Sequence, residues 1–363
     1  MSGHEILIGI MALFALLGAL DRLLGNRFGL GERFEEGILS MGSLALAMIG
    51  IVCLAPVLAA MLRPVIVPVY GFLGADPAMF AGSLLACDMG GGSLAAQMTE
   101  DPQAALLGGV ITGSMLGATL VFTIPVGMGI LKQEDRPAMA KGILCGIVTI
   151  PIGVLVGGLT AGFPAPMVLK NLIPIVLIAA AIAIGLWRAE KAMVRGFAFL
   201  GKLIVGIVTV GLAAAIFEAL TGFSIIPGMA PIDEGFQTVG TIAIVLAGAF
   251  PLVALITKLL QKPLLALGKR LHINDTAAAG LIASLANSIA TFNMVKDMDE
   301  RGKVVNIAFA VSAAFVFGDH LGFTAGFAPE LLGAVIAGKL AGGISAIGIA
   351  LLLTRKDRQG KTL

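Results

Sequence analysis

The chain has 363 residues, of which 58% are hydrophobic and only 13% are charged. A soluble domain carries about 45–50% apolar and about 25% charged residues, so this composition predicts an integral membrane protein. The net charge of +2 gives no indication of a nucleic-acid partner.

Nine long apolar runs fit the roughly 20 residues that a spanning helix needs. In chain order they are 5–24, 38–62, 103–130, 139–160, 164–187, 199–222, 236–259, 302–326 and 330–354. Two further segments, 77–98 and 276–296, are apolar at their ends and polar or glycine-rich at their centres. Each follows a short stretch with a Pro and a basic residue, at 63–76 and 262–275, which we expect to form a helix lying in the membrane interface.

The positions of the basic residues decide whether the two interrupted segments cross the membrane. If both are re-entrant hairpins, almost all of the 24 Lys and Arg residues fall on one side. Eleven full crossings would put the basic stretch 258–270 outside, against the positive-inside rule. The sequence therefore predicts an all-α polytopic membrane protein with nine spanning helices and two re-entrant hairpins. The N-terminus is expected outside and the C-terminus in the cytoplasm.

The two halves of the chain repeat at an offset of about 197–200 residues, which brings Pro64 onto Pro263 and Asp76 onto Asp275. Because the first half starts outside and the second inside, the repeats are predicted to be inverted, as in many secondary transporters. The predicted divisions are a first inverted repeat at 1–160, a connecting helix and cytoplasmic loop at 161–198, and a second inverted repeat at 199–363.

Asp88 stands at the centre of the first interrupted segment, shortly before Gly90 and Gly91. A carboxylate at membrane depth costs about 2.5–3.5 kcal/mol even on the insertion scale, so it should face a partner or a cavity. Glycines let the chain turn and bring bare backbone near a ligand. We expect these three residues to bind a substrate or an ion. The alternative is a capped turn in which Asp88 bonds its own backbone.

The centre of the second interrupted segment carries Asn287, Ser288, Thr291 and Asn293. Amide and hydroxyl groups both donate and accept hydrogen bonds, so they can hold a ligand hydroxyl or coordinate a cation. Hydrogen bonding between helices in lipid is an equally good explanation of this composition.

Asp319 and His320 interrupt the apolar run 302–326 between two glycines. An acid beside a His suits a proton relay, because His titrates near neutrality. The pair is also compatible with a structural break near the outer surface. Glu218 and Lys339 are further charges in or near apolar runs, and an ion pair or snorkelling to the interface would explain them.

The sequence shows no motif for a cofactor, a metal or catalysis. It has no Gly-rich phosphate loop, zinc-type His/Cys spacing or Gly-x-Ser-x-Gly motif, which argues against an ATP-driven pump in this chain alone. Cys53, Cys87 and Cys145 fall in apolar segments and are expected to be packing residues.

Three motifs resemble the bacterial ethanolamine-utilisation permease family, EutH. They are LACDMGG at 85–91, GLIASLAN at 280–287 with MVKDM at 294–298, and FGDHLGF at 317–323. The family pattern leads us to expect a bulkier residue where this chain has Gly92. It also leads us to expect a denser polar run than the one at 288–290. The resemblance implies a cytoplasmic-membrane protein that imports ethanolamine, and it assigns no site residues.

Ethanolamine is a small alkylamine, protonated at neutral pH much as the Lys amine is, with its pKa of about 10.4. Its cation needs a carboxylate for the ammonium and a polar partner for the hydroxyl, and Asp88 and the Asn287 segment supply both. We therefore predict alternating-access transport at a midplane site between the hairpins. The hairpins would move with helices 103–130 and 302–326 against a stationary part made of helices 5–24, 38–62, 199–222 and 236–259. The alternative is a rocking motion about a fixed site.

Several alternatives stay open. The substrate could be another small cation or amino-alcohol, and the chain could be an amine-conducting channel or a membrane-embedded enzyme. A channel would show no counterflow, and an enzyme would release an altered product. Expected partners are the substrate and membrane lipid, and a homo-oligomer remains open.

Overall fold

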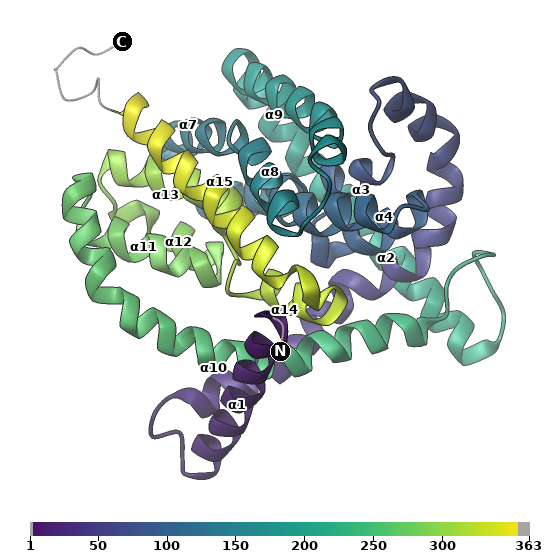
Figure 1. Ribbon diagram of the computed structural model, residues 1–363, viewed down its shortest axis with the longest axis horizontal. Coiled ribbons are helices and arrows are strands. Elements are labelled where there is room, and N and C mark those ends of the chain that lie inside the picture. Colours follow the sequence, from purple (N-terminus) through teal and green to yellow (C-terminus); the bar gives the residue numbers. More distant parts are fainter. Residues whose placement is uncertain (1–2, 355–363) are drawn as a thin grey trace.

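The computed structural model describes residues 3–354, except for the side chains at positions 260–262, 264, 265 and 267. Within this range every regular element is helical (Figure 1). The first elements are α1 (Gly3–Leu23), α2 (Leu30–Phe72), α3 (Ala78–Leu84), η1 (Cys87–Met89), α4 (Gly91–Met98), α5 (Pro102–Leu106), η2 (Leu107–Gly117), η3 (Thr119–Thr123), α6 (Ile124–Ile130), η4 (Gln133–Asp135), α7 (Arg136–Ile147), α8 (Ile150–Thr160) and α9 (Ala165–Thr221). They are followed by α10 (Ile232–Leu271), α11 (Asp275–Ala286), α12 (Ser288–Met294), η5 (Val295–Asp297), α13 (Glu300–Ala313), α14 (Asp319–Phe327), η6 (Pro329–Leu331) and α15 (Leu332–Leu353).

Seven stretches of the described residues are long and apolar enough to cross a membrane, which confirms the membrane class. One of them, Ala165–Thr221, contains two of the predicted runs, on either side of a non-helical residue at Ala189. The predicted run 302–326 falls on α13 and α14, which a non-helical break separates. Large apolar side chains such as Leu23, Trp187 and Leu220 are more than three-quarters exposed. Lipid, rather than water, is the solvent that suits such a surface.

The stretches 63–76 and 262–275 do not form separate helices, contrary to the prediction. The first continues α2 to Phe72 and the second continues α10 to Leu271, with Pro64 and Pro263 inside the helices. Proline removes a hydrogen bond and bends a helix, but it does not have to end one. Figure 1 shows α10 as a long helix that curves along one edge of the molecule towards α11.

Glycines bring helices from the two ends of the chain into backbone contact. A Cβ atom at Gly50 of α2 would strike the carbonyl oxygen of Val208 in α9. In the same way, a Cβ atom at Gly248 of α10 would strike the carbonyl oxygen of Met11 in α1. Small residues allow this approach, which is how helices gain packing contacts in lipid.

Helices α2 and α10 pack along each other in opposite directions. Gly37, near the start of α2, lies against Ala247 in the middle of α10. Gly235, near the start of α10, lies against Ile49 in the middle of α2. Because the early part of each helix meets the later part of the other, the two helices are antiparallel.

Both interrupted segments fold back so that their two ends meet. At the base of α3 and α4, the Thr99 hydroxyl donates to the Asp76 carboxylate at 2.7 Å. At the base of α11 and α12, the Asn274 side chain donates to the Asp297 carbonyl at 3.0 Å, and the Asn274 backbone N–H donates to Asp299 at 2.8 Å. Each segment is therefore a helical hairpin with its break at the tip.

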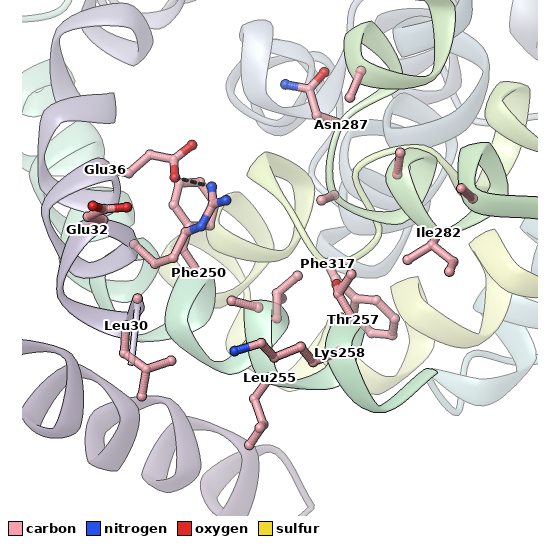
Figure 2. Close-up of a pocket in the computed structure, with 18 of the residues that line it drawn as sticks. Leu30, Glu32, Glu36, Phe250, Leu255, Thr257, Lys258, Ile282, Asn287 and Phe317 are labelled. Carbon is pink, nitrogen blue, oxygen red and sulfur yellow. Dashed lines mark hydrogen bonds and ion pairs between the residues drawn. The ribbon is translucent and has the colours of Figure 1, made fainter. Parts of the chain in front are cut away.

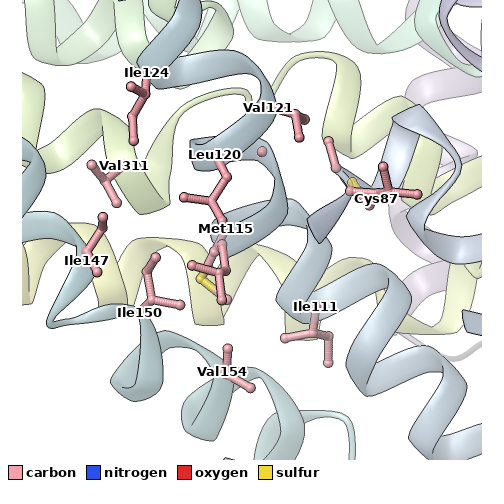
Figure 3. Packing of buried hydrophobic residues seen from close by; sticks show 14 of the residues in the cluster. Cys87, Ile111, Met115, Leu120, Val121, Ile124, Ile147, Ile150, Val154 and Val311 are labelled. Atoms are coloured by element: carbon pink, nitrogen blue, oxygen red, sulfur yellow. The ribbon is translucent and has the colours of Figure 1, made fainter. Parts of the chain in front are cut away.

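The core between these elements is closely packed. Ile111 and Met115 of η2 lie with Ile150 and Val154 of α8 and with Val311 of α13 (Figure 3). All five side chains are at most 2% exposed. Segment η2 is π-helical, a geometry that is rare and often found at functional sites.

We expect Gly248→Ala to lower the unfolding temperature in detergent, because the new methyl group would meet the Met11 carbonyl oxygen. Overpacking of this kind costs about 1–3 kcal/mol. Gly240→Ala on the same helix is the matched control, since a Cβ atom there meets nothing within 4 Å. It should leave stability unchanged or raise it slightly, because Ala is the better helix former. Equal unfolding temperatures for the two variants would contradict the packing described here.

Candidate functional site

The tip of the first hairpin is a glycine turn that presents Asp88. Gly90 has a φ of 88°, in the left-handed region that favours glycine, and a Cβ atom there would strike Ile51. The Gly91 N–H donates to the Ala86 carbonyl at 2.9 Å. The two glycines thus shape the tip around Asp88, whereas substrate binding by their backbone stays a prediction.

Asp88, His320 and Lys339 form a buried polar network from three separate elements. Nε2 of His320 lies 3.7 Å from Oδ1 of Asp88. Nδ1 of His320 lies 3.0 Å from Nζ of Lys339, which also donates to the Ser114 carbonyl in η2 at 2.5 Å. The side chains of His320 and Asp88 are 4% and 16% exposed, so Asp88 is the more accessible of the two. The structure therefore brings two of the predicted site residues together.

Lys339 is a functional candidate that the sequence interpretation undervalued. The residue is only 1% exposed and lies in the middle of α15, so its ammonium cannot snorkel to an interface. Its charge is instead held beside His320. An ionisable residue inside a membrane span is by default a candidate for function, and that signal could have identified it.

Cys87, Asp88 and His320 place their ligand atoms within 4.8 Å of one another. This spacing could surround a metal ion, and nothing else among the described residues points to one. The cysteines themselves are buried and free, as expected for packing residues.

The tip of the second hairpin uses part of its polar composition internally. Asn287 caps α12, and its side-chain oxygen accepts from the Ile289 N–H at 2.8 Å. The Thr291 hydroxyl donates to the Gly280 carbonyl at 2.9 Å and so joins α12 to α11. Among the described residues, Ser288 is fully buried with no hydrogen-bond partner for its hydroxyl.

The break before α14 contacts both hairpin tips. The backbone N–H groups of Phe315 and Phe317 donate to the Ser284 and Leu285 carbonyls of the second hairpin at 3.0 and 2.8 Å. Three residues beyond Phe317, His320 faces Asp88 of the first hairpin. Phe315 has a φ of 62°, so the break is held in a backbone conformation that costs energy.

A pocket of about 1130 Å³ opens beside the second hairpin tip. Asn287, Asn293 and Asp319 line it, whereas Asp88 and His320 are not among its lining residues. Figure 2 shows Asn287 on one wall and the acidic side chains of Glu32 and Glu36 on the opposite wall. Most of the lining is apolar, so the few polar groups would fix the orientation of a bound molecule.

The predicted site therefore divides into two neighbouring parts. Asp319 belongs to the pocket, and the next residue, His320, belongs to the buried network. Carboxylates in both parts can pair with a cation, and the amides of Asn287 and Asn293 can bond a hydroxyl. In the described part of the chain no hydrogen bond or ion pair joins Asp88 to Asn287, which the sequence analysis placed on opposite sides of one ligand.

Comparison with known proteins identifies the family. The family model described as "Ethanolamine utilisation protein, EutH" matches residues 4–353. A protein of Listeria monocytogenes named "Probable ethanolamine permease EutH" is 57% identical over 98% of this chain and 95% of its own length. The "Uncharacterized protein YxeR" of Bacillus subtilis is 54% identical over 98% and 96%. A "Probable ethanolamine permease EutH" of Salmonella typhimurium is 47% identical over 98% and 96%. No solved structure matches the chain. The chain therefore belongs to the EutH family of ethanolamine utilisation proteins.

Proposed function

We propose that this protein is an ethanolamine permease of the cytoplasmic membrane, which carries the ethanolammonium cation by alternating access. The names of the relatives supply the substrate and argue against an enzyme. The observation that carries the proposed site is that one short stretch contacts both hairpin tips: the break before α14 bonds the second tip, and His320 at the start of α14 faces the first. Discontinuous helices that meet in this way form the substrate sites of many secondary transporters.

The chemistry of the proposed site suits a small amino-alcohol. The ammonium group would pair with Asp88, and Asp319 in the adjoining pocket would attract the approaching cation. The hydroxyl group would bond Asn287 or Asn293, beside the buried and unpartnered hydroxyl of Ser288. Gly90 and Gly91 would give the ligand access to backbone at the first tip, and His320 would link Asp88 to Lys339. Thr291 would act by holding the second tip in shape.

Reciprocal contacts between the halves support the inverted repeat. At the offset of about 198 residues, Gly50 corresponds to Gly248, and Met11 corresponds closely to Val208. The pair Gly50–Val208 and the pair Gly248–Met11 are therefore equivalent contacts with the halves exchanged. Because the corresponding helices α2 and α10 are antiparallel, an axis in the membrane plane would relate the halves.

The pocket indicates which side the site would face. Its lining includes Arg33 and Lys258, which lie on the strongly basic side of the chain. If that side is cytoplasmic, the structure represents an inward-open state with the N-terminus outside and the C-terminus inside. The helices predicted to be stationary, α1, α2, α9 and α10, contact one another, which supports their assignment as a scaffold.

Uptake of radiolabelled ethanolamine into proteoliposomes tests the proposed function. We expect saturable uptake above that of protein-free vesicles, and counterflow from preloaded vesicles. A channel would conduct without counterflow, and a carrier for another small cation would not be inhibited by ethanolamine. Uptake no greater than that of protein-free vesicles would contradict the proposal.

Arg270→Cys and Lys296→Cys flank the second hairpin and should both react with a membrane-impermeant thiol reagent only from the cytoplasm. Glu100→Cys, after the first hairpin, should react only from outside. All three positions are exposed, and the native cysteines are buried, so background labelling should be low. If Arg270→Cys and Lys296→Cys react from opposite faces, the second hairpin crosses the membrane and the topology is wrong.

We expect Asp88→Asn to weaken ethanolamine binding by at least about thirtyfold, because losing one partner of a desolvated charge pair costs about 2–5 kcal/mol. Binding should be measured on detergent-purified protein that elutes as a single species, so that loss of folding is recognised. Asp233→Asn, at an exposed position at the start of α10, is the matched control and should bind normally. Wild-type affinity in folded Asp88→Asn would remove Asp88 from the site.

A further inference from the structure

We propose that ethanolammonium binding at Asp88 releases the proton of Lys339, so that the permease exchanges its substrate for a proton and moves no net charge. The inference rests on the proposed function, and it adds the coupling ion. It rests on the geometry of the buried network, in which the ammonium of Lys339 is the positive charge that balances Asp88.

The hydrogen bonds of the network define its charge state. When Lys339 is an ammonium, Nδ1 of His320 at 3.0 Å must accept a hydrogen bond from it. His320 is then neutral, and its proton is on Nε2, the nitrogen that faces Asp88. One positive charge on Lys339 is therefore balanced by one negative charge on Asp88, with a neutral imidazole between them.

Few other charges are close enough to alter this balance. The titratable groups that face the network are Cys87 beside Asp88 and Asp319 beside His320, and Asp319 in turn faces the exposed Glu36 of α2. Helix α10 packs against α14 at Ile242 and Leu246 and carries no titratable side chain between Glu234 and Lys258. Helix α1, which touches α15, carries its charged residues near its two ends. Helices η2 and α8, which pack against α15, carry no titratable side chain. The titratable side chains of α13 are Glu300, Arg301 and Lys303, near its start. They lie about three turns before Ser312, where α13 contacts α15. α7 carries Arg136 and Lys141 in its first half and a buried Cys145, while Glu330 on η6 is exposed.

A substrate cation at Asp88 would upset this balance. The buried network would then hold two ammonium groups and the single carboxylate of Asp88, because Asp319 lies outside it, in the pocket. Proteins remove an uncompensated charge in a medium of low dielectric by neutralising it. Lys339 is able to lose a proton, whereas an Arg in its place would remain charged.

The structure provides a route for that proton. Nζ of Lys339 passes a proton to Nδ1 of His320, and Nε2 of His320 releases its own proton past Asp88, the more exposed member, to water. Before this step the site holds ethanolammonium, the Lys339 ammonium and the Asp88 carboxylate. After it, the substrate is paired with the carboxylate, Lys339 is a neutral amine, and one proton has gone to water. The reverse occurs when the substrate leaves on the other side, so each cycle exchanges one cation for one proton.

The test compares charge and proton movement with substrate uptake in proteoliposomes. Radiolabel gives the uptake, solid-supported membrane recording gives the current, and a trapped pH dye reports protons, all corrected for protein-free vesicles. Measurement near pH 6.5 keeps the neutral amine scarce, since amines of this type titrate near pH 10. Wild-type protein should take up ethanolamine without current and with about one proton leaving per molecule.

Two variants identify the proton-carrying group. Lys339→Met should give uptake that carries about one elementary charge per ethanolamine, because its site has no proton to release. Lys339→Arg, which stays protonated, should lose at least about tenfold in uptake. Each variant must elute as a single species. Carriage of the neutral amine would give the same wild-type stoichiometry, so the loss of proton exchange in Lys339→Met is the result that assigns the proton to Lys339.

The possible failures are distinguishable. A wild-type current of about one charge per ethanolamine would overturn the exchange but leave the permease standing. Proton exchange that persists in Lys339→Met, or wild-type uptake by Lys339→Arg, would overturn the role of Lys339. Wild-type uptake no greater than that of empty vesicles would overturn the proposed function itself.

Discussion

Ionisable side chains buried in a membrane protein need partners, and this constraint governs the centre of the structure. Asp88, His320 and Lys339 lie on three separate elements, Asp88 far in sequence from the other two, and each would be costly alone in a low-dielectric interior. Together they pair one acid with one ammonium through an imidazole. The hairpin turn, the break before α14 and the approach of α15 to η2 are the structural features that place these groups in contact.

Glycine makes those features possible. Gly90 gives the first tip its left-handed turn, and Gly50 and Gly248 let helices of the two halves meet at backbone distance. Many buried polar groups in this closely packed interior are satisfied by hydrogen bonds, whereas the buried hydroxyl of Ser288 is not. In the pocket beside Asp319, polar side chains line open volume rather than each other.

Hydropathy and charge patterns were enough to predict an all-helical membrane protein, and both interrupted segments are hairpins whose ends meet. Those signals are local, and they depend on composition and on loop charge. Asp88 and His320 were also recognised, because a charge in an apolar run is conspicuous. The contact of Lys339 with His320 could not be read from the sequence, since it depends on how α15 packs against η2 and α14. The continuity of α2 through Pro64 was missed because a proline can either bend or end a helix.

The central claim is that ethanolamine binds where the two hairpin tips meet. A structure determined with ethanolamine bound tests this claim most directly. The account predicts the ligand nitrogen at about 2.7–2.9 Å from a carboxylate oxygen of Asp88 or Asp319, with its hydroxyl facing the second hairpin tip. Ethanolamine held only at the pocket mouth beside Glu32 and Glu36, with both tips unoccupied, would contradict it.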